Sequence, residues 1–184
     1  MNTKITPFLF AIGIMAVLIV GADPFPVWAE QGAFMSKHEA LESRVKELED
    51  REEIRQLIMD YGRFLDQRDF HSFSELFAKT AGEWIGGMGR AKGSKAIREL
   101  MESTIGKDTT LTQSCHLFTN ETIHVNGDQA TALTKWIFVV SGESNRPQLF
   151  FLGHYEDEMV REDGRWKFLR RVVRADIPGD DQIQ

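Results

Sequence analysis

Cysteine is almost absent from this sequence, which has only Cys115 among its 184 residues. No disulfide can form within the chain, so packing of the core has to hold the fold even in an oxidising compartment. Basic character is lacking too, since the formal net charge is −6 and no basic patch stands out. Binding to a phosphate backbone requires such a patch, and we therefore expect no nucleic-acid partner. Repeats and low-complexity tracts are also missing, as in an ordinary globular domain.

Signatures of metal, cofactor and nucleophile chemistry are missing as well. The histidines are scattered, and no His-x-x-x-His pair with the spacing of metal ligands occurs. The glycines of residues 86–93 lack the spacing and context of a phosphate loop or a dinucleotide site. No serine occupies a nucleophile elbow, and the adjacent Cys115 and His116 would point to opposite faces of a strand. The sequence therefore predicts neither a metal site nor a bound cofactor.

The first 29 residues have the order of a secretory signal peptide. One basic residue, Lys4, precedes an uncharged stretch over residues 5–22, and Pro24 and Pro26 then lead to small residues ending at Ala29. This order predicts export with cleavage after Ala29. An uncleaved membrane anchor is the alternative, but the apolar run is shorter than the roughly 20 residues that a spanning helix needs. We expect a secreted or periplasmic protein with signal peptide 1–29 and no stable membrane insertion after cleavage.

A linker and a charged helix follow in residues 30–50. Ser36 can cap this helix, with Glu39 three residues later as its reciprocal partner. The apolar residues of the helix form a narrow stripe, which consists of Leu41, Val45 and Leu48. The helix either extends the next one or packs on a second subunit, although two heptads are too few to predict a coiled coil.

The first half of the domain, residues 51–105, has mainly helical periodicity. Residues 51–67 carry a broad apolar face, which includes Tyr61, and form the first helix. Asp69 can cap a short second helix over residues 72–77. Residues 83–85 form a short strand, the glycines of residues 86–93 indicate a loop, and residues 94–105 form a third helix.

From residue 114 onward the apolar pattern alternates, which is typical of strands. Four strands are expected over residues 114–125, 129–141, 147–161 and 165–175, and Asn126-Gly127 between the first two is a strong hairpin signal. Residues 177–184 form a polar, loose tail. Helices followed by an antiparallel meander predict an α+β fold, in which the helices cover one face of a curved sheet and leave a pocket.

Motifs spread over residues 51–173 resemble the SnoaL-like family of the nuclear transport factor 2-like superfamily. They are Tyr61, Asp66 and Asp69, then Leu76-Phe77-Ala78, the segments 115–120 and 126–130, Gly153-His154-Tyr155, and Asp163-Gly164-Arg165-Trp166. The resemblance implies a SnoaL-like domain over residues 51–176, with a cone-shaped antiparallel sheet and three helices that enclose a deep cavity, often in a homodimer. Relatives include scytalone dehydratase, bile acid dehydratase, polyketide cyclases, isomerases and non-enzymatic binders, so the resemblance is much more specific for fold than for activity.

The bile acid dehydratase-like branch uses a tyrosine, an aspartate five residues later and a histidine that opens a strand, and Tyr61, Asp66 and His116 match these positions. A neutral imidazole can take a proton from a carbon next to a carbonyl, and a carboxylate can hold the other ring nitrogen. A phenol can donate to an oxygen that gains negative charge. Gly62, one turn before Asp66, leaves room for the carboxylate to turn inward. The alternatives are a core tyrosine, a solvent-exposed carboxylate and a hydrogen-bonded core histidine.

Four further residues are expected to bind substrate. Phe118 and Asn120 share one face of the first long strand with His116, because alternate residues of a strand point to the same side. His154 on the third strand is a second polar group for the cavity. Trp136 on the second strand completes the set.

Two functions remain open at this point. The first is a cofactor-free lyase (a dehydratase) or an isomerase that acts on a small apolar cyclic or hydroxylated compound through His116 and Asp66. The second is a non-catalytic module that binds a small apolar ligand or serves as an assembly partner in the envelope. Separation of the two side chains beyond hydrogen-bond reach, or a cavity filled by side chains, would argue against the first.

Overall fold

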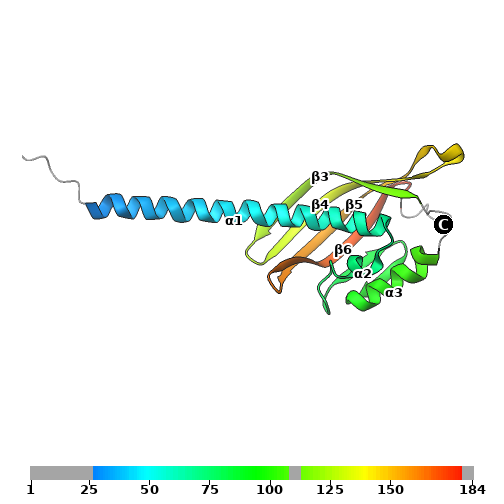
Figure 1. Cartoon of the computed structure of the whole chain (residues 1–184), viewed down its shortest axis with the longest axis horizontal. Helices are drawn as coiled ribbons and strands as arrows, with labels where there is room; N and C mark the ends of the chain where they lie inside the picture. The colour runs from blue at the N-terminus through cyan, green and yellow to red at the C-terminus, as the bar shows by residue number, and fades with distance from the viewer. Residues whose placement is uncertain (1–26, 108–112, 180–184) are drawn as a thin grey trace, which may run out of the picture. The chain divides into compact units, whose positions relative to one another are not determined.

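The computed structural model describes residues 27–107 and 113–179 (Figure 1). The chain divides into two units, with the boundary between Leu41 and Glu42 inside helix α1. Of the first unit, the structure describes residues 27–41, which are all helical. Residues 1–26 of the predicted signal peptide and residues 180–184 of the predicted tail lie outside the described residues.

Helix α1 is continuous from Val27 to Asp66, where the sequence predicted two helices. Residues 33–61 contain no glycine or proline, so nothing in this stretch ends one helix and begins another. The charged segment therefore extends the next helix, which is one of the two expected outcomes. Ser36 lies in the helix interior, and the prediction that it caps a helix start is wrong.

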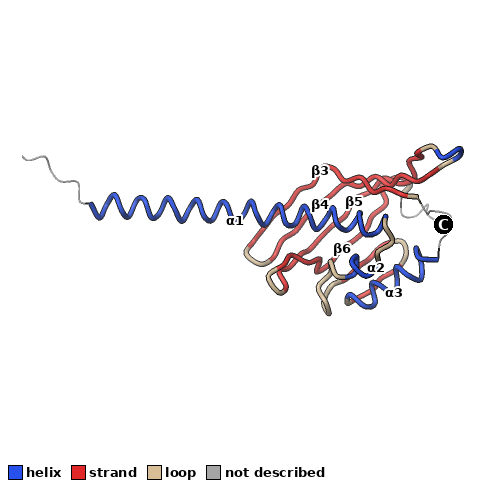
Figure 2. Tube along the Cα trace, in the orientation of Figure 1, coloured by secondary structure: helices blue, strands red, loops and turns tan. Residues whose placement is uncertain are grey.

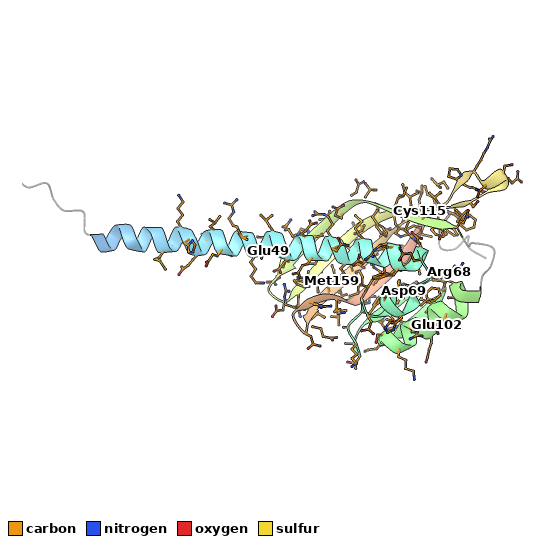
Figure 3. All side chains as sticks on the ribbon, in the orientation of Figure 1. Glu49, Arg68, Asp69, Glu102, Cys115 and Met159 are labelled. Carbon is orange, nitrogen blue, oxygen red and sulfur yellow. The ribbon has the colours of Figure 1, made fainter. Side chains whose placement is uncertain are left out.

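Two shorter helices follow α1. Helix α2, Phe70–Ser74, begins after Asp69 (Figure 3), whose carboxylate accepts a 3.0 Å hydrogen bond from the backbone N–H of Ser72. Asp69 is thus confirmed as a helix cap, and the hydrogen bonds from Ser72 lower the pKa of its carboxyl group. Helix α3, Ser94–Thr104, continues into the short 3-10 turn Ile105–Lys107.

The strands form one curved, unclosed sheet in the order β2-β1-β6-β5-β4-β3. They are β1 (Glu83–Gly86), β2 (Gly89–Lys92), β3 (Ser114–Asn126), β4 (Gln129–Ser141), β5 (Pro147–Glu162) and β6 (Arg165–Ile177). The α+β class is confirmed, and the four long strands form the expected antiparallel meander. Two details differ from expectation. Strand β1 pairs in parallel with β6, and β2 occupies part of the segment predicted as a loop, where it forms a hairpin with β1.

A β-bulge in β3 changes which side chains face the core. The register with β4 shifts between Thr119 and Thr122, and Asn120 adopts a φ of 53°. His116 before the bulge is partly buried, Asn120 within the bulge is exposed, and Ile123 after it is buried. The prediction that Asn120 shares a face with His116 is wrong, because the extra residue of a bulge reverses the alternation.

The second unit packs its helices over one face of the sheet, as Figures 1 and 2 show for α1, α2 and α3. Buried side chains of α1 contribute Ile54, Leu57 and Ile58 to one core cluster with residues of the sheet. Large aromatic side chains dominate this core, and Trp84 and Phe168 are almost fully buried. The core therefore lies between the helices and the sheet, which is also where the cavity lies.

Candidate functional site

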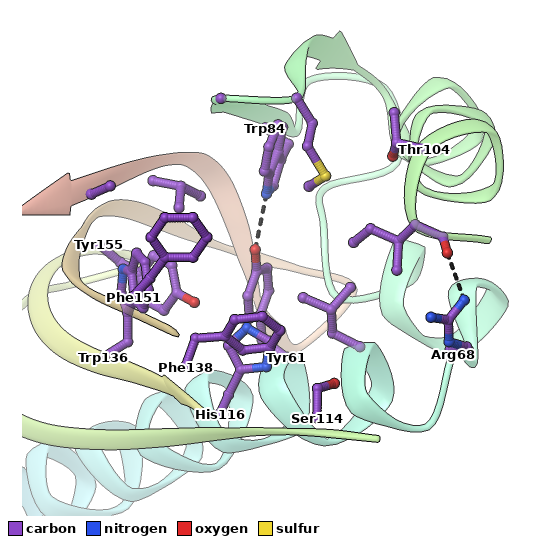
Figure 4. Close-up of a pocket in the computed structure, with 16 residues that line it drawn as sticks. Tyr61, Arg68, Trp84, Thr104, Ser114, His116, Trp136, Phe138, Phe151 and Tyr155 are labelled. Atoms are coloured by element: carbon purple, nitrogen blue, oxygen red, sulfur yellow. Dashed lines mark hydrogen bonds between the residues drawn. The ribbon is translucent and has the colours of Figure 1, made fainter. Parts of the chain in front are cut away.

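A cavity of about 450 Å³ lies between the helices and the covered face of the sheet (Figure 4). Its walls are largely aromatic and aliphatic. They consist of Tyr61, Leu65, Arg68, Trp84, Gly87, Met88, Thr104, Ile105, Ser114, His116, Trp136, Phe138, Phe151, Tyr155, Val173 and Ala175. Side chains do not fill this space, and an apolar cavity of this size with a few polar groups is typical of a small-molecule site.

Asp66, the last residue of α1, holds His116 of β3 through two contacts. Its Oδ1 lies 2.7 Å from Nδ1 of the imidazole, and its Oδ2 accepts a 2.8 Å hydrogen bond from the backbone N–H of His116. Ser114 donates its hydroxyl to the same Oδ1 at 3.2 Å. A carboxylate that accepts from a backbone N–H and a hydroxyl also accepts from Nδ1, so Nδ1 carries the proton of this contact. In the neutral form of the ring, the lone pair is therefore on Nε2.

The His116 ring lies on the wall of the cavity (Figure 4), against the ring of Phe138 at a centroid distance of 4.6 Å. Within residues 27–107 and 113–179, Nε2 has no hydrogen-bond partner. Asp66 holds the ring at Nδ1, and the lone pair of Nε2 is on the opposite side of the ring. This is the arrangement of a general base.

Tyr61 presents a neutral phenol to the same cavity. Its side chain is 2% exposed, and its hydroxyl oxygen accepts a 2.9 Å hydrogen bond from the indole N–H of Trp84 (Figure 4). Burial raises the pKa of Tyr61, and the positive charge of Arg171 and the hydrogen bond from Trp84 offset only part of that effect. The phenol therefore keeps its proton at neutral pH and can donate it to an oxygen in the cavity.

Gly62 brings α1 directly against β3. A Cβ atom at this position would lie 2.6 Å from two ring carbons of Phe118 and 3.1 Å from Cβ of His116. The sequence suggested that Gly62 leaves room for Asp66, but strand β3 occupies that room. The close approach of helix and strand is what lets one carboxylate reach both the ring and the backbone of His116.

Of the four residues expected to bind substrate, Trp136 lines the cavity. Phe118 does not belong to its lining, because its ring packs on Gly62 of α1. Asn120 is outside the lining too, since the bulge leaves it exposed.

His154 is also wrongly predicted as a cavity residue. Phe151 and Tyr155 are the residues of β5 that line the cavity, so His154 lies on the opposite phase of the strand. Its Nδ1 lies 2.7 Å from Asp176 and its Nε2 lies 3.5 Å from Glu156. Phe150 and Leu152 share the phase of His154, so apolar residues on both phases hid which side faces the core.

Sequence reasoning missed a buried ion pair beneath the cavity. Arg171 donates to Asp157 through Nε at 2.7 Å and through Nη2 at 2.6 Å, and both side chains are fully buried. The guanidinium carbon lies 4.0 Å from the ring centroid of Tyr61 and 4.1 Å from that of Tyr155. Burial alone would lower the pKa of Arg171, but the attraction of Asp157 outweighs burial and raises it, so the guanidinium stays charged under both phenols.

Tyr155 is the second missed residue of the cavity wall. Its ring lies 5.3 Å from that of Tyr61 and stacks at 5.7 Å on that of Trp136. Burial, together with the neighbouring Tyr61, raises its pKa well above the usual value. The sequence could have indicated Tyr155, because it directly follows His154 and therefore points to the opposite face of the strand.

In the part of the chain that the structure describes, no three histidine, cysteine or acidic side chains are grouped to hold a metal ion. Among the same residues, no helix combines the length and the apolar character needed to cross a membrane.

The comparison with protein families matches residues 46–172 to the SnoaL-like domain. A sequence relative is the uncharacterized protein Rv2910c of Mycobacterium tuberculosis, which is 29% identical over 130 residues, or 70% of this chain and 86% of the relative.

Solved structures agree with this match. A nuclear transport factor 2-like protein with a cystatin-like fold from Novosphingobium aromaticivorans is 31% identical, with a TM-score of 0.65 over 72% of this chain and 86% of that chain. A scytalone dehydratase-like protein from the same organism is 26% identical, with a TM-score of 0.59 over 73% and 87% of the two chains.

Proposed function

Because the chain belongs to the SnoaL-like domain family, we propose that it is a cofactor-free lyase or isomerase in which His116 is the base. The observation that carries this proposal is the 2.7 Å contact between Asp66 Oδ1 and His116 Nδ1, at the wall of an apolar cavity. This contact leaves Nε2 as the proton acceptor on the cavity side.

The reaction begins when Nε2 takes a proton from a carbon next to a carbonyl. The electron pair of the broken C–H bond moves toward the carbonyl oxygen, to which Tyr61 donates a hydrogen bond. Asp66 stabilises the imidazolium that results. In a dehydration, the electron pair then forms a C=C bond, the neighbouring C–O bond breaks, and the imidazolium returns its proton to the departing hydroxide, which leaves as water. In an isomerisation, the imidazolium exchanges its Nε2 proton with water and then returns a proton to a different carbon of the substrate.

The cavity walls define the substrate class of this proposal. Trp84, Trp136 and Phe138 provide large apolar surfaces, while Tyr61 and His116 provide the polar contacts. A small apolar cyclic or hydroxylated compound meets both requirements. The scytalone dehydratase-like neighbour supports a dehydration as the first reaction to examine.

We also propose that the protein acts outside the cytoplasm, on the pattern of residues 1–29. Export would make coenzyme A thioesters and nucleotides poor candidates for its substrate. Sequencing the amino terminus of the protein from its own host tests this proposal. A start at Glu30 in protein from the exported fraction supports the proposal. Recovery of the protein from the cytoplasmic fraction alone, with Met1 retained, contradicts it.

The catalytic proposal is tested in two steps. Mass spectrometry of small molecules extracted from the protein purified from its host identifies the compound in the cavity. Turnover of that compound is then measured with the wild type, His116→Gln and Asp66→Asn. His154→Gln is the matched control, because His154 also contacts a carboxylate at 2.7 Å but lies outside the cavity lining. Turnover that survives both site changes, or a compound that binds and stays unchanged, would contradict the proposal and favour a binding module.

A further inference from the structure

Helix α1 carries an apolar stripe on a face that the domain does not cover. Val45 and Leu48 are 44% and 66% exposed, and Leu41 continues the stripe in the sequence. At about 100° per residue, Val45 and Leu48 lie roughly 170° around the helix from Asp50 and Ile54. Asp50 and Ile54 are buried, so they mark the face that packs on the domain. The stripe therefore needs a partner other than the core of its own domain.

The stripe has the heptad spacing of a coiled coil. Leu41 and Leu48 fall at d positions, and Val45 falls at the a position between them. Leucine at d with a β-branched residue at a favours two strands. His38 occupies the preceding a position, where a polar side chain fixes register and oligomer state at a cost in stability.

The charged residues beside the stripe determine which partner fits. Lys37 and Arg44 occupy g positions, while Glu42 and Glu49 occupy e positions. In a parallel pair of helices, each g residue lies next to the e residue five positions later on the other helix. Two copies of this chain would therefore pair Lys37 with Glu42 and Arg44 with Glu49, and both pairs are attractive. An antiparallel pair would place g beside g and e beside e, where every contact is repulsive.

Other charges on this helix already have partners within the chain. Lys46 contacts Asp50 at 3.2 Å, and Arg51 contacts Glu47 at 2.9 Å. Within residues 35–107 and 113–179, Arg44 and Glu49 form no such ion pair; Figure 3 labels Glu49, whose side chain is exposed.

Two heptads alone are too few to predict a coiled coil, but the stripe is exposed and the charges beside it match those of a second copy. We propose that residues 37–51 of two copies of this chain form a short, parallel, two-stranded coiled coil. The stripe ends at Glu52, which takes the next a position and pairs with Arg55 at 2.6 Å. Two heptads bury little apolar surface, so the dimer depends on protein concentration and on the g–e′ charge pairs. The proposal does not depend on the activity of the cavity.

Sedimentation equilibrium of the purified protein tests the role of the charges. Arg44→Glu and Glu49→Arg each replace two attractive pairs by two repulsive ones, and each should weaken dimerisation by about tenfold. The double variant Arg44→Glu/Glu49→Arg restores both attractive pairs and should dimerise like the wild type. Ser43→Glu is the control, because Ser43 lies on the opposite face of the same helix. Equal thermal stability of all variants excludes unfolding as the cause.

A cysteine at the stripe tests the orientation. In a Cys115→Ser background, Leu48→Cys should form a covalent dimer on mild oxidation, because identical d positions face each other only in a parallel pair. Ser43→Cys in the same background should not. A wild-type protein that stays monomeric at high concentration, charge variants that dimerise unchanged, or equal cross-linking at both positions would overturn the proposal.

Discussion

Asp66 contacts His116 at both the ring and the backbone, with Oδ1 2.7 Å from Nδ1 and Oδ2 2.8 Å from the backbone nitrogen. One carboxylate thereby fixes the position of the strand and the tautomer of the ring together. The last turn of α1 and the start of β3 are thus coupled at the cavity wall, and the chemistry proposed for His116 depends on this coupling.

Replacing Asp66 by Asn should reverse the tautomer of His116. The amide oxygen has to accept the backbone N–H of His116, so the amide NH₂ faces Nδ1 and forces that nitrogen to act as an acceptor. Nε2 then carries the proton and cannot act as a base. Nitrogen-15 NMR of the histidine side chains should report a protonated Nδ1 in the neutral ring of the wild type and a protonated Nε2 in Asp66→Asn. The same tautomer in both proteins would contradict the assignment.

Replacing Gly62 by Ala should destabilise the protein, although the same change in an exposed helix usually stabilises it. The new Cβ would lie 2.6 Å from the ring of Phe118 and 3.1 Å from Cβ of His116, so the Phe118 ring has to shift or the helix and strand have to move apart. We expect a loss of about 1–3 kcal/mol in the free energy of unfolding, measured by chemical denaturation.

Gly87→Ala is the control for this change, because nothing lies within 4 Å of a Cβ at that position. Its effect should stay within about 0.5 kcal/mol. Equal effects of the two substitutions would show that the contact between α1 and β3 is not tight.

Removing one partner of the buried ion pair between Arg171 and Asp157 should lower the free energy of unfolding more than removing both partners does. Arg171→Met leaves Asp157 buried without a counter-ion, and we expect a loss of about 3–5 kcal/mol. The double variant Arg171→Met/Asp157→Leu removes both charges and should recover most of that loss. Denaturant titration of the single and double variants measures the difference. A double variant that is less stable than Arg171→Met would contradict this interpretation.

Stability should fall in acid because of Asp50. Burial alone would raise the pKa of this carboxyl group, but hydrogen bonds from Trp166 and Lys46 and the charge of Arg161 outweigh burial and lower it. A pKa lower in the folded than in the unfolded state gives stability above the unfolded pKa, and this stability is lost as the pH falls through the folded pKa. Thermal unfolding of the wild type and Asp50→Asn between neutral and acidic pH checks this. The difference in unfolding temperature between the two proteins should shrink in acid. A difference that stays constant with pH would contradict the role of Asp50.

The sequence predicted the long strands well because their ends carry local signals. Asn126-Gly127 and the turn at Asp163-Gly164 each separate two strands, and together they set one end of each of the four long strands to within one residue of its observed position. The helix cap at Asp69 was equally local. Features that depend on two distant segments were not predictable in this way. The parallel pairing of β1 with β6 joins segments whose sequences carry no shared signal.

In the candidate site, too, local features could be predicted from the sequence, whereas features that depend on distant segments could not. The spacing of Tyr61 and Asp66 along one helix could be recognised, whereas the bulge at Asn120 could not, because it arises from pairing with β4. The inward phase of β5 was ambiguous, so His154 was predicted in place of Tyr155. The pair of Arg171 and Asp157 was hidden because charged residues usually indicate a solvent-exposed face.

The most direct test of the account is proton exchange at the carbon that His116 attacks. The compound extracted from the cavity is incubated in deuterated water with the wild type, His116→Gln or His154→Gln, and its mass is followed. The account predicts that the wild type and His154→Gln introduce deuterium into the substrate carbon or into the product, and that His116→Gln does not. Deuterium uptake or product formation at the wild-type rate with His116→Gln would contradict the proposal that His116 is the base.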